Sequence, residues 1–297
     1  MKSASGQSTA PLALFWENTV IADIGRRSRI RGNHIVEFAN LESRRYLAQA
    51  RGTRGVQKIK PLLEAAKALV WEPAVRRWAN LSVALSSSEI PSGDSYSTNQ
   101  TILVPNGVEQ RPAIQSASTS RVVLAVGSWW YEPNREGLEE VLQSVWPLVV
   151  AKIPEAKLLV VGRGADDLVS DKSPHSGVSN LGFVDDLQPL YESSALVLAP
   201  AKSGAGSQLK LVGALARGRV VVGPAYLERE TRNGDLPADA VIGTDDQAET
   251  IVRLLENSEE RHRREAAAIR FSRENSWEKV VAPIVAYLDT LARERSV

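Results

Sequence analysis

The sequence predicts an α/β protein in which a doubly wound parallel sheet forms the C-terminal domain and a smaller, incomplete α/β domain precedes it. From residue 122 onward, short apolar runs rich in Val and Leu alternate with helical segments. Such near-continuous apolar strands are typical of a parallel sheet that is covered on both faces. With 297 residues, the chain is too long for one small core and too short for three ordinary domains.

The composition excludes several classes of function. Lys and Arg number 36 against 35 Asp and Glu, so no global basic field exists and nucleic acid is not an expected partner. The absence of cysteine rules out disulfides, thiolate catalysis and cysteine-ligated metals. The histidines His34, His175 and His262 lie far apart, and we expect no metal site built from them. The N-terminus is polar and no apolar run has the length of a membrane span, so we expect a cytoplasmic protein.

The first hundred residues show a mixed pattern that is hard to close into a complete sheet. A long helical stretch, residues 58–80, contains Pro61 and Pro73, and we expect it to be interrupted at both. Within it Trp71 and Trp78 share one helical face, and we interpret this face as part of the core or of a seam between domains. Because Lys67 is nearby, contact with a membrane surface is the alternative. The expected strands are Leu12–Trp16, Ile35–Ala39, Leu81–Leu85 and Thr101–Pro105.

After a polar segment at residues 109–120, which we interpret as a linker, the pattern becomes regular. The expected domains are residues 1–112, residues 119–275 and a closing helix at residues 276–297. The expected strands are Val122–Gly127, Lys157–Gly162, Val178–Phe183, Ala195–Pro200, Arg219–Gly223 and Asp239–Gly243. The expected helices are Asn134–Ile153, Asp186–Ser193, Ser207–Arg217, Gln247–Glu256, Glu259–Glu274 and Trp277–Arg293.

One glycine-rich turn stands out as a candidate anion site. The stretch from Lys202 to Lys210 lies between an apolar strand and a helix, so its glycines and the N–H groups of the first helical turn are placed to bind a phosphate. A plain strand-to-helix connection is the alternative. Neither this turn nor the one at Gly162 completes a GxGxxG pattern, because Leu209 and Asp167 occupy the third glycine position. No nicotinamide-type fingerprint is therefore expected. A Walker loop is not expected either, because no Gly-Lys-Ser/Thr follows at the required spacing.

The helix after this turn places Gly206, Lys210, Gly213 and Arg217 on one face. Lys210 could therefore neutralise a diphosphate, and a solvated surface lysine is the alternative. Gly213 is unusual because glycine inside a helix costs about 1 kcal/mol relative to alanine. It indicates either close packing or a place from which a side chain has been removed.

Other conspicuous residues have a structural and a functional interpretation. Trp129 and Trp130 follow a strand end, where an aromatic ring can stack on a base, but we favour a seam between domains. His34 is the one candidate for a catalytic group, against the alternative of a partly buried histidine with satisfied hydrogen bonds. The charge run at residues 259–265, which includes His262, is interpreted as a solvated helix face.

Several of these features occur in an order typical of one family. They are Pro105-Asn106-Gly107-Val108, Gly127-Ser128 with Glu132-Pro133-Asn134, Val161-Gly162-Arg163-Gly164, Gly182 to Leu187, and Ala199-Pro200 through Gly204 and Lys210 to Gly218 and Val222. The set resembles the C-terminal domain of the GT-B glycosyltransferases of family 4, the glycosyl transferases group 1, here with a shortened Rossmann-like N-terminal domain. The resemblance runs from about Ile102 to the end, where the last helix resembles the family's closing helix, which crosses back to the N-terminal domain.

The resemblance implies a glycosyltransferase that moves a sugar from a nucleoside-diphosphate sugar to a hydroxyl of a glycan or lipid-linked glycan in polysaccharide biosynthesis, with retention of configuration. No cofactor or metal is implied, since N–H groups and a lysine carry the charge. The residues implied for phosphate and donor sugar are Gly127, Ser128, Gly204, Ala205, Gly206, Ser207 and Lys210. Those implied for base and ribose are Gly162, Arg163, Val184, Asp185 and Gly213.

Two departures keep other hypotheses open. Many family members have two glutamates at the positions that are Ala205 and Gly213 here, and the second change removes a carboxylate acceptor for ribose hydroxyls. The region before Asn106 is also short for an acceptor-binding domain. A non-catalytic relative that partners with another chain, in a homo- or hetero-oligomer, is therefore the second hypothesis. A sugar-nucleotide epimerase is the third, although no acid and base pair is placed for it.

Overall fold

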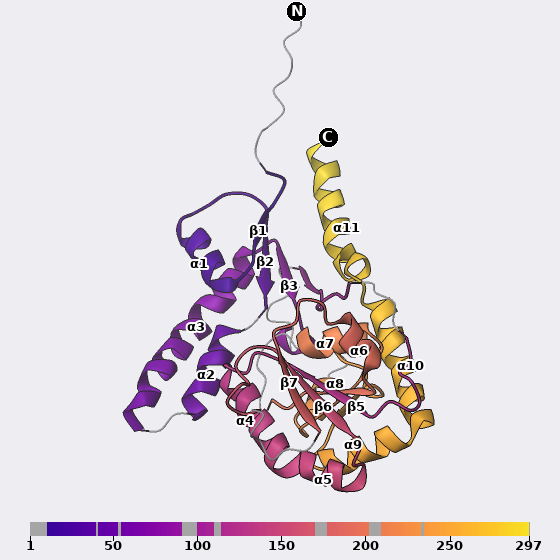
Figure 1. Ribbon diagram of the computed structural model, residues 1–297. Coiled ribbons are helices and arrows are strands. Elements are labelled where there is room, and N and C mark those ends of the chain that lie inside the picture. Colours follow the sequence, from indigo (N-terminus) through magenta and orange to yellow (C-terminus); the bar gives the residue numbers. More distant parts are fainter. Residues whose placement is uncertain are drawn as a thin grey trace, which may run out of the picture. The chain divides into compact units, whose positions relative to one another are not determined.

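The computed structural model describes residues 11–39, 41–52, 55–90, 100–109, 114–169, 177–201, 209–232 and 235–296. The chain divides into two compact units (Figure 1). The first unit combines Met1–Pro105 with Val280–Val297, and the second is Asn106–Lys279. Within the part of the chain that is described, no helix is long and apolar enough to cross a membrane.

The first unit is built on a parallel sheet with the strand order β1-β2-β3-β4, counting the described residues only. All four predicted strands are confirmed, with shifted ends. The strands are β1 (Leu14–Trp16), β2 (His34–Phe38), β3 (Leu81–Ala84) and β4 (Gln100–Leu103). The helical segments are α1 (Thr19–Arg27), α2 (Glu42–Gly52), η1 (Gly55–Lys58), α3 (Ile59–Trp78), η2 (Ser87–Glu89) and α11 (Trp277–Arg295).

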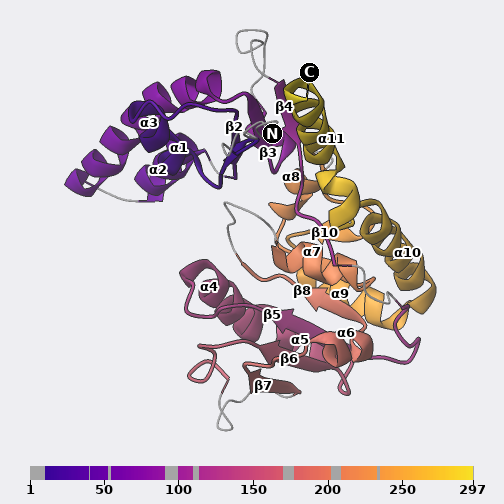
Figure 2. The ribbon, with the colours of Figure 1, turned by 90° about the horizontal axis from the view of Figure 1, so that it is seen from above.

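Side chains that alternate along β2 enter two separate cores of the first unit. Val36 and Phe38 pack with α1 and α3 on one face, while Ile35 packs with β3 and with Val280 of α11 on the other. Figure 2 shows α11 beside β3 and β4. Because a parallel sheet must be covered on both faces, the last helix supplies a layer that the first hundred residues lack.

Helix α3 is continuous, so the predicted interruptions at Pro61 and Pro73 are wrong. Pro61 lies in the first turn, where a missing N–H leaves no helical hydrogen bond unmade. Pro73 lies in the interior of the helix. There it is flanked by buried Glu72, whose carboxylate accepts hydrogen bonds from the backbone N–H (3.0 Å) and hydroxyl (2.6 Å) of Ser43 in α2. Tertiary packing of this face overrides the local cost of proline.

The second unit is built on a parallel sheet with the order β10-β9-β8-β5-β6-β7 among its described residues. Every predicted strand of this region is present, so the doubly wound parallel class is confirmed. The strands are β5 (Val122–Val126), β6 (Lys157–Val161), β7 (Val178–Gly182), β8 (Leu196–Leu198), β9 (Val220–Gly223) and β10 (Val241–Gly243).

Helices cover both faces of this sheet. Val123 and Ala125 of β5 pack toward α4, α5 and α9, whereas Leu124 between them packs toward α7 and α10. The helical segments are α4 (Glu132–Glu140), the π-helical η4 (Val141–Val145), α5 (Trp146–Lys152), α6 (Gln188–Ser193), α7 (Leu209–Ala216), α8 (Leu227–Arg232), α9 (Gln247–Glu256) and α10 (Ser258–Glu274). The helix expected at residues 134–153 is thus one run with a π-helical middle.

A buried ion pair anchors α10 to the sheet. Arg219, at the start of β9, donates to Glu265 of α10 over 3.0 Å, and both side chains are fully buried. The remaining donors of Arg219 bond the carbonyls of Tyr191 and Ile114, and the second oxygen of Glu265 accepts from the N–H of Ser116. Each buried charge is therefore hydrogen-bonded, as burial requires.

The prediction of a solvated face at residues 259–265 is therefore wrong for part of it, because Glu260, Arg261 and Glu265 are buried. Arg261 is fully buried and donates to the carbonyls of Leu254 and Ala117. Residues 114–118 were expected to be part of a linker. Instead, they lie hydrogen-bonded against α10, which gives the charge run its buried partners.

We expect Glu265→Ala to lower the free energy of unfolding of the second unit by about 3–5 kcal/mol, because Arg219 would remain as a buried charge without its partner. Urea unfolding followed by circular dichroism measures this loss. Glu64→Ala is the matched control: Glu64 pairs with Lys67 at 2.8 Å on an exposed helix face, and its removal should cost only about 0.3–0.5 kcal/mol. Equal losses in the two variants would contradict this account of the buried pair.

Candidate functional site

The strand order of the second unit reverses between β5 and β8, so a crevice is expected at the carboxyl ends of these two strands. The chain winds from β5 through β6 to β7 in one direction and from β8 through β9 to β10 in the other. β5 and β8 are hydrogen-bonded neighbours, with Val123 opposite Leu196. In doubly wound sheets such a reversal point leaves a crevice outside the strand ends, where ligands bind. The turn at Gly127–Ser128 and the chain after Pro200 therefore flank one site.

Backbone hydrogen bonds from glycines connect the turns after β5, β6 and β7. The N–H of Gly127 donates to Val161 over 3.0 Å, and that of Gly162 donates to Gly182 over 2.6 Å. Gly162 has a φ of +118°, and a Cβ at this position would lie 1.8 Å from the carbonyl oxygen of Gly127. Only glycine fits there. The sequence-predicted residues Gly127 and Gly162 therefore build the edge of the crevice with their backbones.

Lys210 and Asn134 connect the two sides of this crevice. The Lys210 ammonium donates to Oδ1 of Asn134 over 2.7 Å, and Nδ2 of Asn134 donates to the carbonyl of Ser128 over 2.9 Å. Because a lysine can only donate and a carbonyl can only accept, these contacts fix the orientation of the amide. Lys210 of α7 is thereby held beside the turn that follows β5.

The Lys210 side chain carries a charge that is poorly compensated. It is half-buried, and burial lowers the pKa of its ammonium. Among the described residues, the hydrogen-bond partner of Lys210 is the neutral amide of Asn134. A desolvated cation beside a neutral partner favours an anionic ligand. The alternative of a solvated surface lysine is wrong.

A glycine in α4 brings the two sides into contact. A Cβ on Gly137 would lie 1.8 Å from the carbonyl oxygen of Pro200, which follows β8. Helix α4 therefore touches the backbone of the other loop, which places Asn134 one turn away within reach of Lys210. Neither Asn134 nor Gly137 is among the site residues predicted from the sequence. A glycine inside a helical pattern was the available signal for Gly137, whereas nothing local to Asn134 indicated its partner.

The residues predicted for base and ribose lie along the neighbouring turns. The guanidinium of exposed Arg163 lies over the ring of Phe183, 4.7 Å from its centroid. Val184 is half-buried against the core under α7, and Asp185 is exposed. The turns after β6 and β7 thus present a cation, an aromatic ring and a carboxylate to solvent.

Gly213 does not mark close packing. A Cβ there would lie 3.9 Å from Nη1 of Arg217 and 3.9 Å from the hydroxyl oxygen of Tyr191, which are ordinary contact distances. Arg217 lies over the Tyr191 ring and donates to Gln188 and to the carbonyl of Gly213. As predicted, Lys210, Gly213 and Arg217 lie on one helix face, all of them half-buried. Close packing therefore does not explain Gly213. The other explanation, a position from which a side chain has been removed, stays a prediction.

Four predicted site residues, Gly204, Ala205, Gly206 and Ser207, lie outside the described residues. The predicted roles of Gly127 and Ser128 as phosphate ligands stay predictions, as does the expectation that no metal takes part. Ser128 is exposed at the crevice.

Trp129 belongs to the core of the second unit, so the preference for a domain seam is wrong. Its side chain is fully buried and its indole N–H donates to the carbonyl of Val161 over 3.2 Å. Trp130 is 71% exposed and lies against Gly164. Both rings therefore contact the turn after β6, Trp129 near Gly162 and Trp130 at Gly164.

His34, the catalytic candidate, lies in the first unit with both ring nitrogens engaged. Nδ1 accepts from the Trp16 indole N–H at 3.2 Å, Nε2 lies 3.0 Å from the Ile30 carbonyl, and the ring stacks on Trp78 at 3.9 Å between centroids. These partners require a neutral ring with its proton on Nε2. The side chain is 3% exposed, and burial lowers the pKa of His34 although the Ile30 carbonyl opposes this. His34 is therefore a buried histidine with satisfied hydrogen bonds, which was the alternative to a catalytic role.

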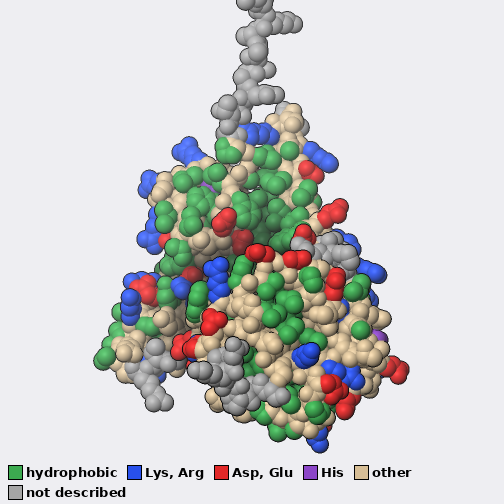
Figure 3. Space-filling model, in the orientation of Figure 1, with side chains coloured by type: hydrophobic (Ala, Val, Ile, Leu, Met, Phe, Trp, Pro, Cys, Tyr) green, Lys and Arg blue, Asp and Glu red, His purple; other side chains and the backbone are tan. Residues whose placement is uncertain are grey.

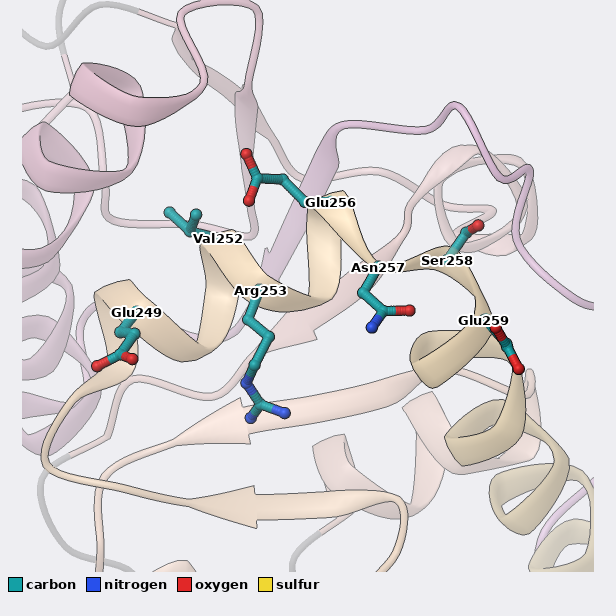
Figure 4. A pocket seen from close by; sticks show the side chains of 7 residues that line it. All are labelled: Glu249, Val252, Arg253, Glu256, Asn257, Ser258 and Glu259. Atoms are coloured by element: carbon teal, nitrogen blue, oxygen red, sulfur yellow. The ribbon is translucent and has the colours of Figure 1, made fainter.

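A hollow lies along α9 and the start of α10 (Figure 4). Its lining begins at Glu249 in the first turn of α9 and ends at Glu259 of α10, and it does not include Lys210 or the turns after β5, β6 and β7. Three carboxylates and one arginine line it, and that arginine also pairs with Glu260. Such a lining does not suit a diphosphate.

Comparison with known proteins identifies a related family. Residues 120–257 match the family described as "Glycosyl transferases group 1". The chain is 26% identical over 226 residues to the phosphatidyl-myo-inositol mannosyltransferase of Mycolicibacterium smegmatis and 26% identical over 228 residues to that of Mycobacterium tuberculosis. Each alignment covers 73% of this chain. The chain spans only 55% and 57% of the lengths of these two relatives.

Solved structures share the fold. Sucrose-phosphate synthase from Thermosynechococcus elongatus superimposes with a TM-score of 0.65 at 18% identity, covering 95% of this chain and 74% of that one. Anabaena Alr3699/HepE, solved in complex with UDP and glucose, superimposes with a TM-score of 0.59 at 15% identity, covering 94% and 77%. Both likenesses extend over the two units of this chain.

We expect Gly213→Ala to raise the free energy of unfolding by about 0.5–1 kcal/mol, because alanine is the better helix former and its Cβ has room. Gly137→Ala makes the same change in another helix, where the Cβ would meet the Pro200 carbonyl at 1.8 Å. It should destabilise the protein by about 3 kcal/mol. Thermal and urea unfolding measure both, and a destabilising Gly213→Ala would overturn this account of the helix.

We expect the first unit to lose stability as the pH falls through about 6.5, because the unfolded chain takes up a proton on His34 there and the folded chain does not. The loss should reach at most about 1.4 kcal/mol per pH unit. Urea unfolding between pH 7.5 and 5.5 measures the slope, and His34→Gln should remove this residue's share of it. An imidazole NMR resonance of His34 that titrates with a midpoint at or above 6.5 would contradict the prediction.

Proposed function

We propose that this chain, whose C-terminal domain belongs to the glycosyl transferases group 1 family and which has the GT-B fold, transfers a sugar from a nucleoside-diphosphate sugar to a hydroxyl. The observation that carries the proposal is the half-buried Lys210, held by Asn134 at the crevice where the sheet reverses direction. Diphosphate is a ligand whose negative charge matches such a cation.

In this proposal the turn after β5, with Gly127 and Ser128, and the segment Gly204–Ser207 with Lys210 hold the diphosphate and the donor sugar. Gly162, Arg163, Val184, Asp185 and Gly213 line the place of the base and ribose. The acceptor oxygen forms a bond to the anomeric carbon as the bond from that carbon to the phosphate oxygen breaks, and the acceptor hydroxyl passes its proton to the departing diphosphate. Lys210 stabilises the negative charge that gathers on the leaving diphosphate.

The names of the relatives support a class of acceptor. The mannosyltransferases that this chain resembles are named for a phosphatidyl-myo-inositol acceptor, which supports a glycan or lipid-linked glycan as acceptor here. We also propose retention of the anomeric configuration and a cytoplasmic location, and we propose no cofactor or metal.

One observation favours a second candidate, a non-catalytic relative that binds a nucleotide sugar and works with another chain. Gly213 offers no carboxylate to ribose hydroxyls, although its position has room for a side chain. Sugar transfer or donor hydrolysis by the isolated chain would eliminate this candidate. Binding of a nucleotide without any turnover, over a panel of acceptors, would favour it.

We expect Lys210→Met to raise the Kd for a nucleoside diphosphate about 10- to 100-fold, since one charge-assisted hydrogen bond is lost. Asn134→Asp should weaken binding at least as much, because a carboxylate would pair with Lys210 and repel the phosphates. Calorimetric titration with UDP, GDP, ADP and TDP, after a thermal-shift screen with these nucleotides and their sugars, measures the effect.

The matched control is Lys152→Met, which removes an exposed lysine at the end of α5 and should leave the Kd unchanged. If no nucleotide of the panel stabilises the wild-type chain at millimolar concentration, the proposed function fails. If Lys210→Met and Lys152→Met bind equally well, the assignment of the diphosphate to this crevice fails.

A further inference from the structure

Helix α3 carries two apolar stripes on opposite sides. One stripe, formed by Pro61, Ala65, Ala68 and Val75, is buried in the first unit. The other stripe repeats at the same helical spacing, on the side that faces away from this packing. It consists of Ile59, Leu62, Leu63, Ala66, Leu69 and Val70. A surface helix of a soluble domain ordinarily has one apolar stripe and a polar outer face, so the second stripe requires a separate explanation.

The second stripe is open to solvent. Ile59 is 56% exposed, Leu63 57% and Val70 75%, and Val56 in the preceding turn is 80% exposed. Single exposed aliphatic side chains are normal, but a contiguous row along one helix marks an interaction surface.

The segment that carries this row is basic. Between residues 42 and 78 the sequence has nine Lys or Arg against three Glu, although the whole chain carries a net charge of only +1. Glu72 and Arg76 are both buried, so neither offers its charge to a partner. Lys60 and Lys67 are seven residues apart and lie along one flank of the apolar row, where Lys67 also pairs with Glu64 at 2.8 Å. Figure 3 shows apolar and basic side chains together at the end of the first unit where α2 and α3 lie.

We propose that α3, with the turn η1 before it, lies in the interface of an anionic membrane. The aliphatic row enters the boundary of the acyl chains, and the lysines beside it extend their charged ends to the lipid headgroups. The helix does not span the bilayer, since its opposite stripe is occupied by the core of the first unit. The charge of the segment commits the proposal to anionic lipid, because Lys and Arg near such a surface each add to binding.

This inference stands apart from the proposed function. It rests on α3 alone, and it holds whether or not the crevice of the second unit binds a nucleotide sugar. A chain that binds vesicles but no nucleotide would leave the present inference intact and end the proposed function.

The first experiment measures vesicle binding of the full chain by flotation at 0.1 M salt. We expect binding to vesicles of 30% phosphatidylglycerol in phosphatidylcholine and little binding to pure phosphatidylcholine. Leu63→Gln with Val70→Gln should reduce the partition at least about tenfold, and Lys60→Gln with Lys67→Gln should do so as well. The matched controls are Leu148→Gln with Leu181→Gln and Lys152→Gln with Lys157→Gln, which change exposed residues of the second unit. They should bind like the wild type.

The second experiment uses the absence of cysteine from the chain. A polarity-sensitive dye on Val70→Cys should brighten and shift to the blue when the phosphatidylglycerol vesicles are added, whereas the same dye on Leu148→Cys should not respond. Equal responses at the two positions, or full vesicle binding by the Leu63→Gln, Val70→Gln variant, would overturn the proposal. A third outcome would also overturn it: the wild-type chain sediments as a dimer, the Leu63→Gln, Val70→Gln variant sediments as a monomer, and neither binds vesicles. In that case a second copy of the chain covers the row.

Discussion

The reversal of strand order between β5 and β8 is the constraint on which the candidate site depends. Parallel strands point their carboxyl ends to one edge, and where the winding changes direction the following helices diverge and leave a crevice. Gly137 in α4 and Gly162 after β6 allow backbones to touch around this point. Because these contacts fix α4 against the loop after β8, Asn134 reaches Lys210. The position of one desolvated cation thus follows from the topology of the whole sheet.

Buried charge holds the outer layer of the same unit. Arg219 and Glu265 join the beginning of β9 to α10, and Arg261 joins α10 to the segment at residues 114–118. A pair of this kind contributes little net stability when formed, but the loss of one partner is costly. Each partner therefore depends on the other to keep its charge compensated where α10 packs on β9. The neutral His34 of the first unit is held by hydrogen bonds instead, because its two nitrogens contact the Trp16 indole and the Ile30 carbonyl.

The two units use their surfaces differently. In the second unit, the turns at the strand ends expose polar and charged groups, such as Arg163 and Asp185. In the first unit, the conspicuous exposed groups are aliphatic and lie along a regular helix, as in Leu63 and Val70. Recognition of a small polar ligand needs convergent hydrogen-bonding groups, whereas adsorption to lipid needs area and charge. The chain has both kinds of surface, each on its own unit.

The sequence by itself determined the class of fold, the strands and most helices, and the turns at Gly127 and Gly162, because hydrophobic periodicity and backbone freedom are local properties. It also placed Lys210, Gly213 and Arg217 on one helix face. It could not determine that Trp129 is core, that Arg261 and Glu265 are buried, or that Asn134 holds Lys210. Nor could it tell which apolar stripe of α3 is covered. Each of these depends on which surfaces meet when distant segments pack, and only the tertiary structure decides that.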